Sequence, residues 1–322
     1  MDASALDTAR ERVPLVENEG KSGATLERVV LADGRRVIVK RFDPEHDLVM
    51  RLTGDGRGRE VEMLHRGLFE QLPSDVGHAV LGGWFEDGYG VLVMRDLGEA
   101  PLSWDDRLDA GRCDALLKGV TSLHRRFHGA PPDGLTPIAD VVGLFEPRRL
   151  APYRGLSLVD YALRGWELWA DLVPGEVGQR VLTLAQDTAP LSAALTACTP
   201  TFIHGDLAGV NLAFEDDALT LIDWGLAAAA PGAVDIGRFL VGCAHTLDVS
   251  PDDFLAMYRH HAADLYDDRA TRLGLLSGLV WLGWNKSLDI GDHPDAAVRE
   301  RERNGLAWWL ARAAEGLEVL DG

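Results

Sequence analysis

One stretch, HGDLAGVNLAFEDDALTLIDWG at residues 204–225, constrains this chain more than any other. Asp206 precedes a loop, Asn211 follows five residues later, and the turn EDDA separates the strand-like NLAF from LTLIDW, which ends at Asp223 and Trp224. The opposed strands of a hairpin hold residue pairs about 5 Å apart. We therefore expect Asp223 to return close to Asn211, so that two acids and an amide gather at one end of a hairpin.

These three side chains suit a metal-assisted reaction. Asn211 and Asp223 offer oxygen ligands of the kind that Mg²⁺ prefers, together with water and substrate phosphates. Asp206 would then orient an attacking hydroxyl and accept its proton. The alternative is structural, because Asp and Asn are common turn formers and any one of them alone more often caps or turns the chain. The spacing of all three favours a site.

The overall composition narrows the class of protein. A formal charge of −19 over 322 residues argues against nucleic-acid binding, and it fits either a cationic substrate or general solubility. The three cysteines are widely spaced, which is typical of a reducing compartment. The N-terminus has no apolar signal-peptide core, and the longest apolar stretch, residues 273–284, is too short to span a bilayer. We expect a cytoplasmic protein that does not bind membranes.

The first hundred residues alternate strand and turn signals. Residues 24–42 read as a β-hairpin around ADGR, and residues 78–98 read as a second hairpin around EDGYG. Between them, residues 54–72 open with glycines, and four apolar residues then recur at helical spacing: Val61, Leu64, Leu68 and Leu72.

After Gly98 the pattern becomes helical, with helices expected in residues 103–129, 157–172 and 178–195. The hairpin of residues 204–225 interrupts them. The sequence thus predicts an α+β chain of two lobes, with a small β-rich lobe at residues 1–97 and a larger, mainly helical lobe at residues 98–322.

The His-Gly-Asp at 204–206, the Asn five residues on and the Ile-Asp-Trp at 222–224 resemble the catalytic loop of the aminoglycoside phosphotransferases and their choline-kinase relatives. These share the protein-kinase fold. The resemblance implies that Asp206 is the catalytic base, that Asn211 and Asp223 hold Mg²⁺, and that His204 is a structural member of the loop.

The resemblance also assigns the lysine that contacts the α- and β-phosphates of ATP. Lys40 ends the strand VIVK, and we expect its ammonium to be exposed there. Glu60 opens the following helix and would form the ion pair that holds Lys40, with Glu62 as the alternative on another face. The chain has four lysines against 28 arginines, and a compact ammonium suits phosphate.

Two further nucleotide contacts follow from the resemblance. NEGKSGAT at residues 18–25 is similar to the family's phosphate loop, with the Ser22 hydroxyl facing the phosphates, although a plain hairpin turn would look the same. VLVMRDLG at residues 91–98 resembles the linker between the lobes. Met94 would lie behind the adenine, and the Arg95 carbonyl and the Leu97 N–H would bond to it, although an edge strand predicts a similar pattern.

The segment after Asp223 indicates a small acceptor. Residues 224–242 contain no Ser, Thr or Tyr, so they offer no phosphorylation site and no peptide platform of the protein-kinase kind. Asp235 would brace the catalytic loop, or else cap a helix.

The acceptor would bind in the helical lobe. Two tryptophan pairs, Trp166 with Trp169 and Trp281 with Trp284, could stack on a sugar or a cation, or could simply pack in the core. Three acids could receive amino groups, or could form a solvated loop: Asp289, Asp292 and Asp295.

The sequence therefore predicts an enzyme that moves the γ-phosphate of ATP, with Mg²⁺, to a hydroxyl of a small polar molecule. An antibiotic, aminoglycoside or other, is the expected acceptor. The alternatives are a metabolic kinase of the same fold, acting on a sugar, a choline-like alcohol or an amino alcohol, and a catalytically silent nucleotide-binding protein. Inactive relatives commonly lose one of Asp206, Asn211, Asp223 or Lys40, and all four are present.

Overall fold

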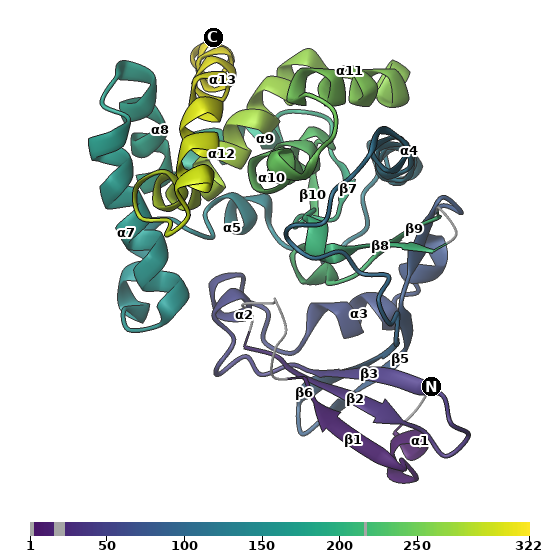
Figure 1. Cartoon of the computed structure of the whole chain (residues 1–322). Helices are drawn as coiled ribbons and strands as arrows, with labels where there is room; N and C mark the ends of the chain where they lie inside the picture. The colour runs from purple at the N-terminus through teal and green to yellow at the C-terminus, as the bar shows by residue number, and fades with distance from the viewer. Residues whose placement is uncertain (1–2, 16–22, 216–217) are drawn as a thin grey trace.

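An antiparallel sheet forms most of the smaller lobe in the computed structural model, which describes residues 3–15, 23–215 and 218–322 (Figure 1). A short helix, α1 (Ser4–Asp7), precedes it. In spatial order the strands are β1 (Glu11–Pro14), β2 (Thr25–Val30), β3 (Arg36–Arg41), β6 (Tyr89–Arg95) and β5 (Val80–Glu86).

Both predicted hairpins of this lobe are confirmed. Strand β2 pairs with β3, and β5 pairs with β6, each in antiparallel register. The second turn is tight because Glu86 lies opposite Tyr89, and both residues between them have positive φ: 50° at Asp87 and 91° at Gly88. A turn of this kind matches the twist of the flanking strands, and an Asp-Gly pair favours it.

The helix predicted within residues 54–72 is shorter than expected. It forms α3 (Arg59–His65), which packs against β5 and β6, and a short helix α2 (Leu48–Leu52) precedes it. Gly67 then adopts a left-handed conformation with φ of 65°, which ends the helix, and a 3₁₀ turn follows at Phe69–Gln71. Leu68 lies outside α3 but is still buried.

Helices dominate the larger lobe, as predicted (Figure 1). They are α4 (Ala110–Arg126), α5 (Ile138–Val142), α6 (Pro147–Leu150), α7 (Ser157–Leu172), α8 (Glu176–Gln186), α9 (Ala189–Thr196), α10 (Ala233–Cys243), α11 (Pro251–Ala262), α12 (Asp268–Gly291) and α13 (Ala296–Asp321).

Two predicted helix boundaries in this lobe are wrong. Helix α4 begins at Ala110 rather than near residue 103, because the Asp109 carboxylate accepts the Arg112 N–H at 2.8 Å and caps the helix there. The stretch 178–195 forms parts of two helices rather than one. Helix α8 ends at Gln186, and α9 restarts with Pro190 in its first turn, where proline is tolerated.

Short strands lie between the helices of the larger lobe. Strand β7 (Thr201–Ile203) pairs with β10 (Ala228–Ala230), and β8 (Leu212–Glu215) pairs with β9 (Ala218–Leu221). Strand β4 (Val76–His78) precedes the linker in sequence but pairs in parallel with β9. We retain the lobe boundary at residue 97 as a proposal.

Helix α12 runs through the centre of the larger lobe and lies against α7, α10 and α13. Its approach to α10 depends on glycines, since a Cβ on Gly237 would lie 1.9 Å from the Gly274 carbonyl oxygen. This crossing fixes α10 against the lobe, and α10 carries two of the residues that shape the site. Within the described ranges, no helix is both long and apolar enough to cross a bilayer.

Candidate active site

The hairpin predicted between Asn211 and Asp223 is present. Strands β8 and β9 pair antiparallel, with Leu212 opposite Leu221, although residues 216–217 of the turn lie outside the described ranges. The Ile222 N–H then donates to the Asn211 carbonyl at 3.1 Å. This bond brings Asp223, the next residue, to the same end of the hairpin as Asn211.

The catalytic loop is held from behind by Asp235. Its carboxylate is fully buried in α10 and accepts the backbone N–H groups of His204 and Gly205, both at 2.9 Å. His124 of α4 reaches the same carboxylate at 3.1 Å, and the His204 ring contacts the Ile222 carbonyl at 3.0 Å. The predicted brace by Asp235 and the structural role of His204 therefore agree with these contacts.

Gly205 is required by the path of this loop. Its φ is 81°, and a Cβ at this position would lie 2.0 Å from the Leu226 carbonyl oxygen. A side chain would push the loop away from the backbone that follows Asp223. The Gly of the His-Gly-Asp motif thus keeps Asp206 and Asp223 in one compact arrangement.

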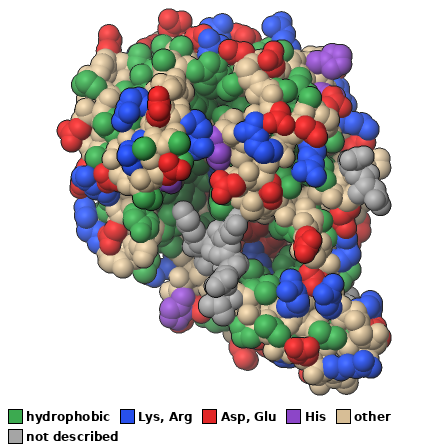
Figure 2. All heavy atoms as spheres, in the orientation of Figure 1, with side chains coloured by type: hydrophobic (Ala, Val, Ile, Leu, Met, Phe, Trp, Pro, Cys, Tyr) green, Lys and Arg blue, Asp and Glu red, His purple; other side chains and the backbone are tan. Residues whose placement is uncertain are grey.

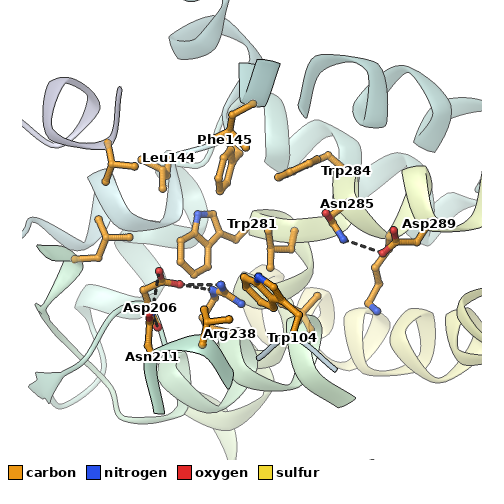
Figure 3. Close-up of a pocket in the computed structure, with 18 of the residues that line it drawn as sticks. Trp104, Leu144, Phe145, Asp206, Asn211, Arg238, Trp281, Trp284, Asn285 and Asp289 are labelled. Atoms are coloured by element: carbon orange, nitrogen blue, oxygen red, sulfur yellow. Dashed lines mark hydrogen bonds and ion pairs between the residues drawn. The ribbon is translucent and has the colours of Figure 1, made fainter. Parts of the chain in front are cut away.

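Asp206 is fixed by a cation that sequence reasoning missed. Arg238 of α10 donates from both Nε and Nη2 to the same oxygen of Asp206, each at 2.8 Å (Figure 3). The Asn211 amide nitrogen donates to the Asp206 carbonyl oxygen at 2.8 Å and lies 3.3 Å from its second carboxylate oxygen. A signal was available, because Arg238 follows Asp235 by three residues and so lies on the same helix face.

Lys40 lies between two carboxylates. Its Nζ is 2.6 Å from Glu60 Oε2 and 2.7 Å from Asp223 Oδ1. The predicted ion pair with Glu60, rather than Glu62, is present. The expectation of an exposed ammonium is wrong, since only 8% of Lys40 is exposed. Lys40 lies on a central strand of the sheet, and its side chain reaches toward α3 and Asp223 rather than toward bulk water.

These charges shift one another's pKa values. Burial would lower the pKa of Lys40, but the Asp223 and Glu60 carboxylates outweigh it and raise that pKa above its ordinary value. Burial raises the pKa of Glu60 despite the opposing effect of Lys40. Lys40 lowers the pKa of Asp223, whose side chain is 44% exposed. Lys40 and Asp223 therefore remain charged at neutral pH.

Glu60 also joins the two lobes. While one oxygen binds Lys40, the other accepts the Trp224 N–H at 2.9 Å. Its neighbour Arg59 donates to the Gly225 carbonyl at 2.9 Å. Asp223, which precedes Trp224, has a left-handed backbone, with φ of 63° and ψ of 67°. Such a conformation costs energy in a residue other than glycine, and it persists only where the surroundings hold it.

The remaining predicted nucleotide contacts are Ser22, Met94, Arg95 and Leu97. Ser22 falls outside the described residues. Met94 and Arg95 end β6, where Met94 is half-buried and the Arg95 guanidinium pairs with Glu215. The Leu97 carbonyl accepts the Ala100 N–H at 3.1 Å. Their predicted contacts with adenine stay predictions.

A cavity of about 680 Å³ is lined by most of the predicted catalytic and phosphate-binding side chains, from both lobes. Lys40, Asp206, Asn211 and Asp223 all line it, whereas Glu60 lies behind Lys40. Figure 2 shows a hollow in the face of the larger lobe with many hydrophobic side chains along it. The cavity continues from the catalytic loop into this lobe, between α10, α12 and α13.

The two predicted tryptophan pairs have different positions. Trp281 and Trp284 of α12 line the cavity, beside Phe145 and Trp104 (Figure 3). Trp166 and Trp169 of α7 do not line it; they donate to backbone carbonyls and pack in the core. Sequence reasoning missed Phe145 and three further aromatic residues of this wall: Trp104, Trp308 and Trp309.

Of the three acids expected near the acceptor, one lines the cavity and two do not. Asp289 lines the cavity and accepts the Asn285 amide at 2.8 Å. Asp292 instead pairs with Arg164 at 3.3 Å, and Asp295 caps α13. Only Asp289 of these three can therefore contact a molecule bound in the cavity.

A match to the sequence model described as "Phosphotransferase enzyme family" covers residues 21–273. No curated protein sequence matches the chain.

Several solved structures share the fold. The choline kinase LicA from Streptococcus pneumoniae has a TM-score of 0.54 and 14% identity, over 96% of this chain and 95% of that one. An aminoglycoside phosphotransferase from Alicyclobacillus acidocaldarius has a TM-score of 0.50 and 15% identity, over 99% of this chain and 93% of that one. A thermostable mutant of aminoglycoside phosphotransferase APH(4)-Ia, in a complex with ADP and hygromycin B, has a TM-score of 0.52 and 10% identity, over 99% of this chain and 97% of that one.

These similarities agree with the two-lobed architecture, and the predicted protein-kinase-like fold is confirmed. The family match extends from the N-terminal sheet through the catalytic loop into α12. The chain therefore belongs to the phosphotransferase enzyme family and is a small-molecule phosphotransferase.

Proposed function

We propose that the chain transfers the γ-phosphate of ATP to a hydroxyl of a small molecule, with Asp206 as the group that orients the hydroxyl and accepts its proton. One observation carries the proposal. Asp206 is held through a single carboxylate oxygen by Arg238, and it lines the same cavity as Lys40 and Asp223. Positioning of this kind supplies most of the catalysis in phosphoryl transfer.

Lys40 would neutralise nucleotide phosphates. Its ammonium is held charged by Glu60 and Asp223, so it presents a fixed positive charge to the cavity. The similar APH(4)-Ia structure contains ADP, which supports a nucleotide as the phosphate donor here. Met94, Arg95, Leu97 and Ser22 remain the proposed contacts to the rest of the nucleotide.

Asn211 and Asp223 fit a Mg²⁺ ion that binds together with the nucleotide. The Asn211 amide nitrogen donates to Asp206, which leaves its amide oxygen for a cation. Asp223 is charged and 44% exposed. Among the described residues, no group of three or more His, Cys, Asp or Glu side chains could hold a metal, so the remaining ligands would be phosphate and water oxygens. When bound, Mg²⁺ neutralises charge on the transferring phosphoryl group.

For the acceptor we propose a hydroxyl-bearing antibiotic, with a metabolite such as a sugar or an amino alcohol as the second candidate. The choline kinase and the aminoglycoside phosphotransferases of similar fold are compatible with both classes of acceptor.

The test compares Asp206→Asn with Asp114→Asn, an exposed carboxylate on α4 that pairs with His261 outside the cavity. Each variant is incubated with ATP, Mg²⁺ and pooled hydroxyl compounds, and mass spectrometry looks for acceptors that gain one phosphate. Asp206→Asn should keep ATP binding and lose roughly 10²–10⁴-fold in kcat. Asp114→Asn should keep both the ATP binding and the kcat of the unsubstituted protein. Near-normal turnover in Asp206→Asn would remove Asp206 from its role.

A further inference from the structure

Most acids in the helical-lobe part of the cavity already have partners. Asp206 binds Arg238. Glu302 lies 2.9 Å from Lys286 and 3.0 Å from Arg301, and both Lys286 and Glu302 are buried. Asp105 is the exposed exception, so water already screens its charge.

Asp289 also has a hydrogen-bond partner of its own. The Asn285 amide donates to it. Burial, with the nearby Glu302 charge, raises its pKa above the ordinary value, which disfavours its charged form. A molecule with several ammonium groups needs accessible carboxylates, and this wall offers few.

Cations of the chain itself also occupy two of the aromatic faces. The Arg238 guanidinium lies 4.7 Å from the centroid of the Trp281 ring, and the Lys286 ammonium lies 5.5 Å from that of Trp309. An aromatic cage attracts an organic cation through such faces. Here Arg238 and Lys286 already occupy the positions at these two faces that an organic cation would take.

Three residues of this wall instead carry hydrogen-bond donors that lack a partner among the described residues. Arg238 Nη1, Trp281 Nε1 and Trp284 Nε1 are buried and have no hydrogen-bond partner within the described part of the chain. All three residues line the cavity and are more than nine-tenths buried. Indole and guanidinium N–H groups can only donate. They therefore suit ether, carbonyl or hydroxyl oxygens, and they do not suit ammonium groups, which only donate.

The surfaces between these donors are apolar. Figure 3 shows Leu144, Phe145, Trp281 and Trp284 around one part of the cavity, with Asp206 at its edge. Phe145 lies 5.1 Å from Trp284 and 6.1 Å from Trp281, centroid to centroid. Aromatic walls of this kind bind flat or ring-shaped apolar surfaces.

We propose, on the basis of the function proposed above, that the acceptor is an uncharged, oxygen-rich alcohol built on rings, such as a neutral glycoside, and neither a polycationic aminoglycoside nor a quaternary amine. Its ring oxygens accept from Trp281, Trp284 and Arg238, and one hydroxyl faces Asp206. That hydroxyl oxygen bonds to the γ-phosphorus, the bond from phosphorus to the ADP oxygen breaks with its electrons leaving on ADP, and the hydroxyl proton passes to Asp206.

The experiment uses matched pairs of ligands with the full-length protein. Each neutral phenyl or disaccharide glycoside is paired with its 2-amino-2-deoxy counterpart, which has the same rings and one added charge, and hygromycin B serves as the polycation. Binding is measured by calorimetry and by quenching of tryptophan fluorescence, so that the readout does not depend on turnover. We expect the neutral member to bind at least about tenfold more tightly, because an ammonium buried without an acceptor loses its hydration.

Two variants locate the binding. Trp284→Phe keeps the aromatic surface and removes the N–H, and it should weaken binding of the neutral glycosides roughly 2- to 10-fold. The control is Trp169→Phe, which removes the donor to the Gly178 carbonyl outside the cavity and should leave ligand affinity unchanged. Thermal melting checks that both variants are folded.

The outcomes separate the two proposals. Amino counterparts or hygromycin B that bind as tightly as the neutral glycosides would overturn the inference, as would a neutral panel of which no member binds. An effect of Trp169→Phe equal to that of Trp284→Phe would also overturn it. Phosphorylation of hygromycin B at a rate above that of every neutral glycoside would refute the inference and leave the phosphotransferase function intact. Neutral glycosides that bind as predicted, with no ATP binding, would instead refute the proposed function.

Discussion

Replacing Lys40 with methionine should destabilise the protein by about 3–5 kcal/mol at neutral pH, because it leaves a buried charge without its partner. Glu60 is only 1% exposed, and the remaining donor to its carboxylate is the Trp224 N–H. The bond from Lys40 to Asp223 adds less, since water reaches the Asp223 side chain. A loss of this size is a large share of the roughly 5–15 kcal/mol that stabilises a typical protein.

This loss of stability should depend on pH through the ionisation of Glu60. Burial already holds the pKa of Glu60 above its ordinary value, and removing Lys40 takes away the main opposing charge. A carboxyl whose pKa is higher in the folded state than in the unfolded state binds its proton more tightly when folded, so protonation favours folding. The destabilisation of Lys40→Met should therefore be full above the folded-state pKa of Glu60, and it should shrink as the pH falls through that value.

Urea unfolding followed by tryptophan fluorescence, at several pH values from about 8 to about 5, measures both effects. The double variant Lys40→Met/Glu60→Gln should recover much of the stability, because it removes the uncompensated charge. The control is Lys118→Met, whose lysine is 63% exposed and pairs with Asp75 at 3.1 Å; it should cost about 0–1 kcal/mol. This reasoning would be refuted if Lys40→Met lowered the free energy of unfolding no more than Lys118→Met does. It would also be refuted if the decrease caused by Lys40→Met did not shrink at low pH.

Two further substitutions test the loop and the metal site. Asp223→Ala should abolish phosphate transfer and the heat of Mg²⁺ binding measured calorimetrically with a non-hydrolysable ATP analogue, because it removes the charged ligand; transfer at a comparable rate would exclude the metal role. Asp235→Asn should lower the free energy of unfolding by about 1.5–3 kcal/mol and reduce kcat, since one amide oxygen cannot replace the carboxylate that binds the His204 and Gly205 N–H groups. An unchanged melting temperature would contradict the brace.

The sequence predicted the parts of the site that depend on local structure. Asn211 and Asp223 meet because the hairpin between them is encoded within a dozen residues. The pairing of Lys40 with Glu60 was predicted from the family resemblance, which supplied a contact across 20 residues. Helix boundaries were missed although their signals were present, such as the left-handed Gly67 and the capping Asp109.

The parts that were not predicted arise from packing between distant segments. Arg238 reaches Asp206 from α10, which packs closely against α12 at glycines; its spacing from Asp235 places it on the same helix face, but periodicity in one helix does not reveal which residue of another segment it meets. The burial of Lys40 was missed for a similar reason, since Asp223 is 183 residues away in sequence. Local pattern identifies which side chains carry chemistry, whereas tertiary packing decides which of them are buried and paired.

The net charge illustrates the same distinction, because its effect depends on where the charges lie. A value of −19 left a cationic substrate open as one interpretation. In the helical-lobe wall of the cavity, however, Asp206 is matched by Arg238, and Glu302 is matched by Lys286. Two acids of this wall, Asp105 and Asp289, have no such match within the described ranges, so most of the excess of acids lies outside the acceptor site, where it favours solubility.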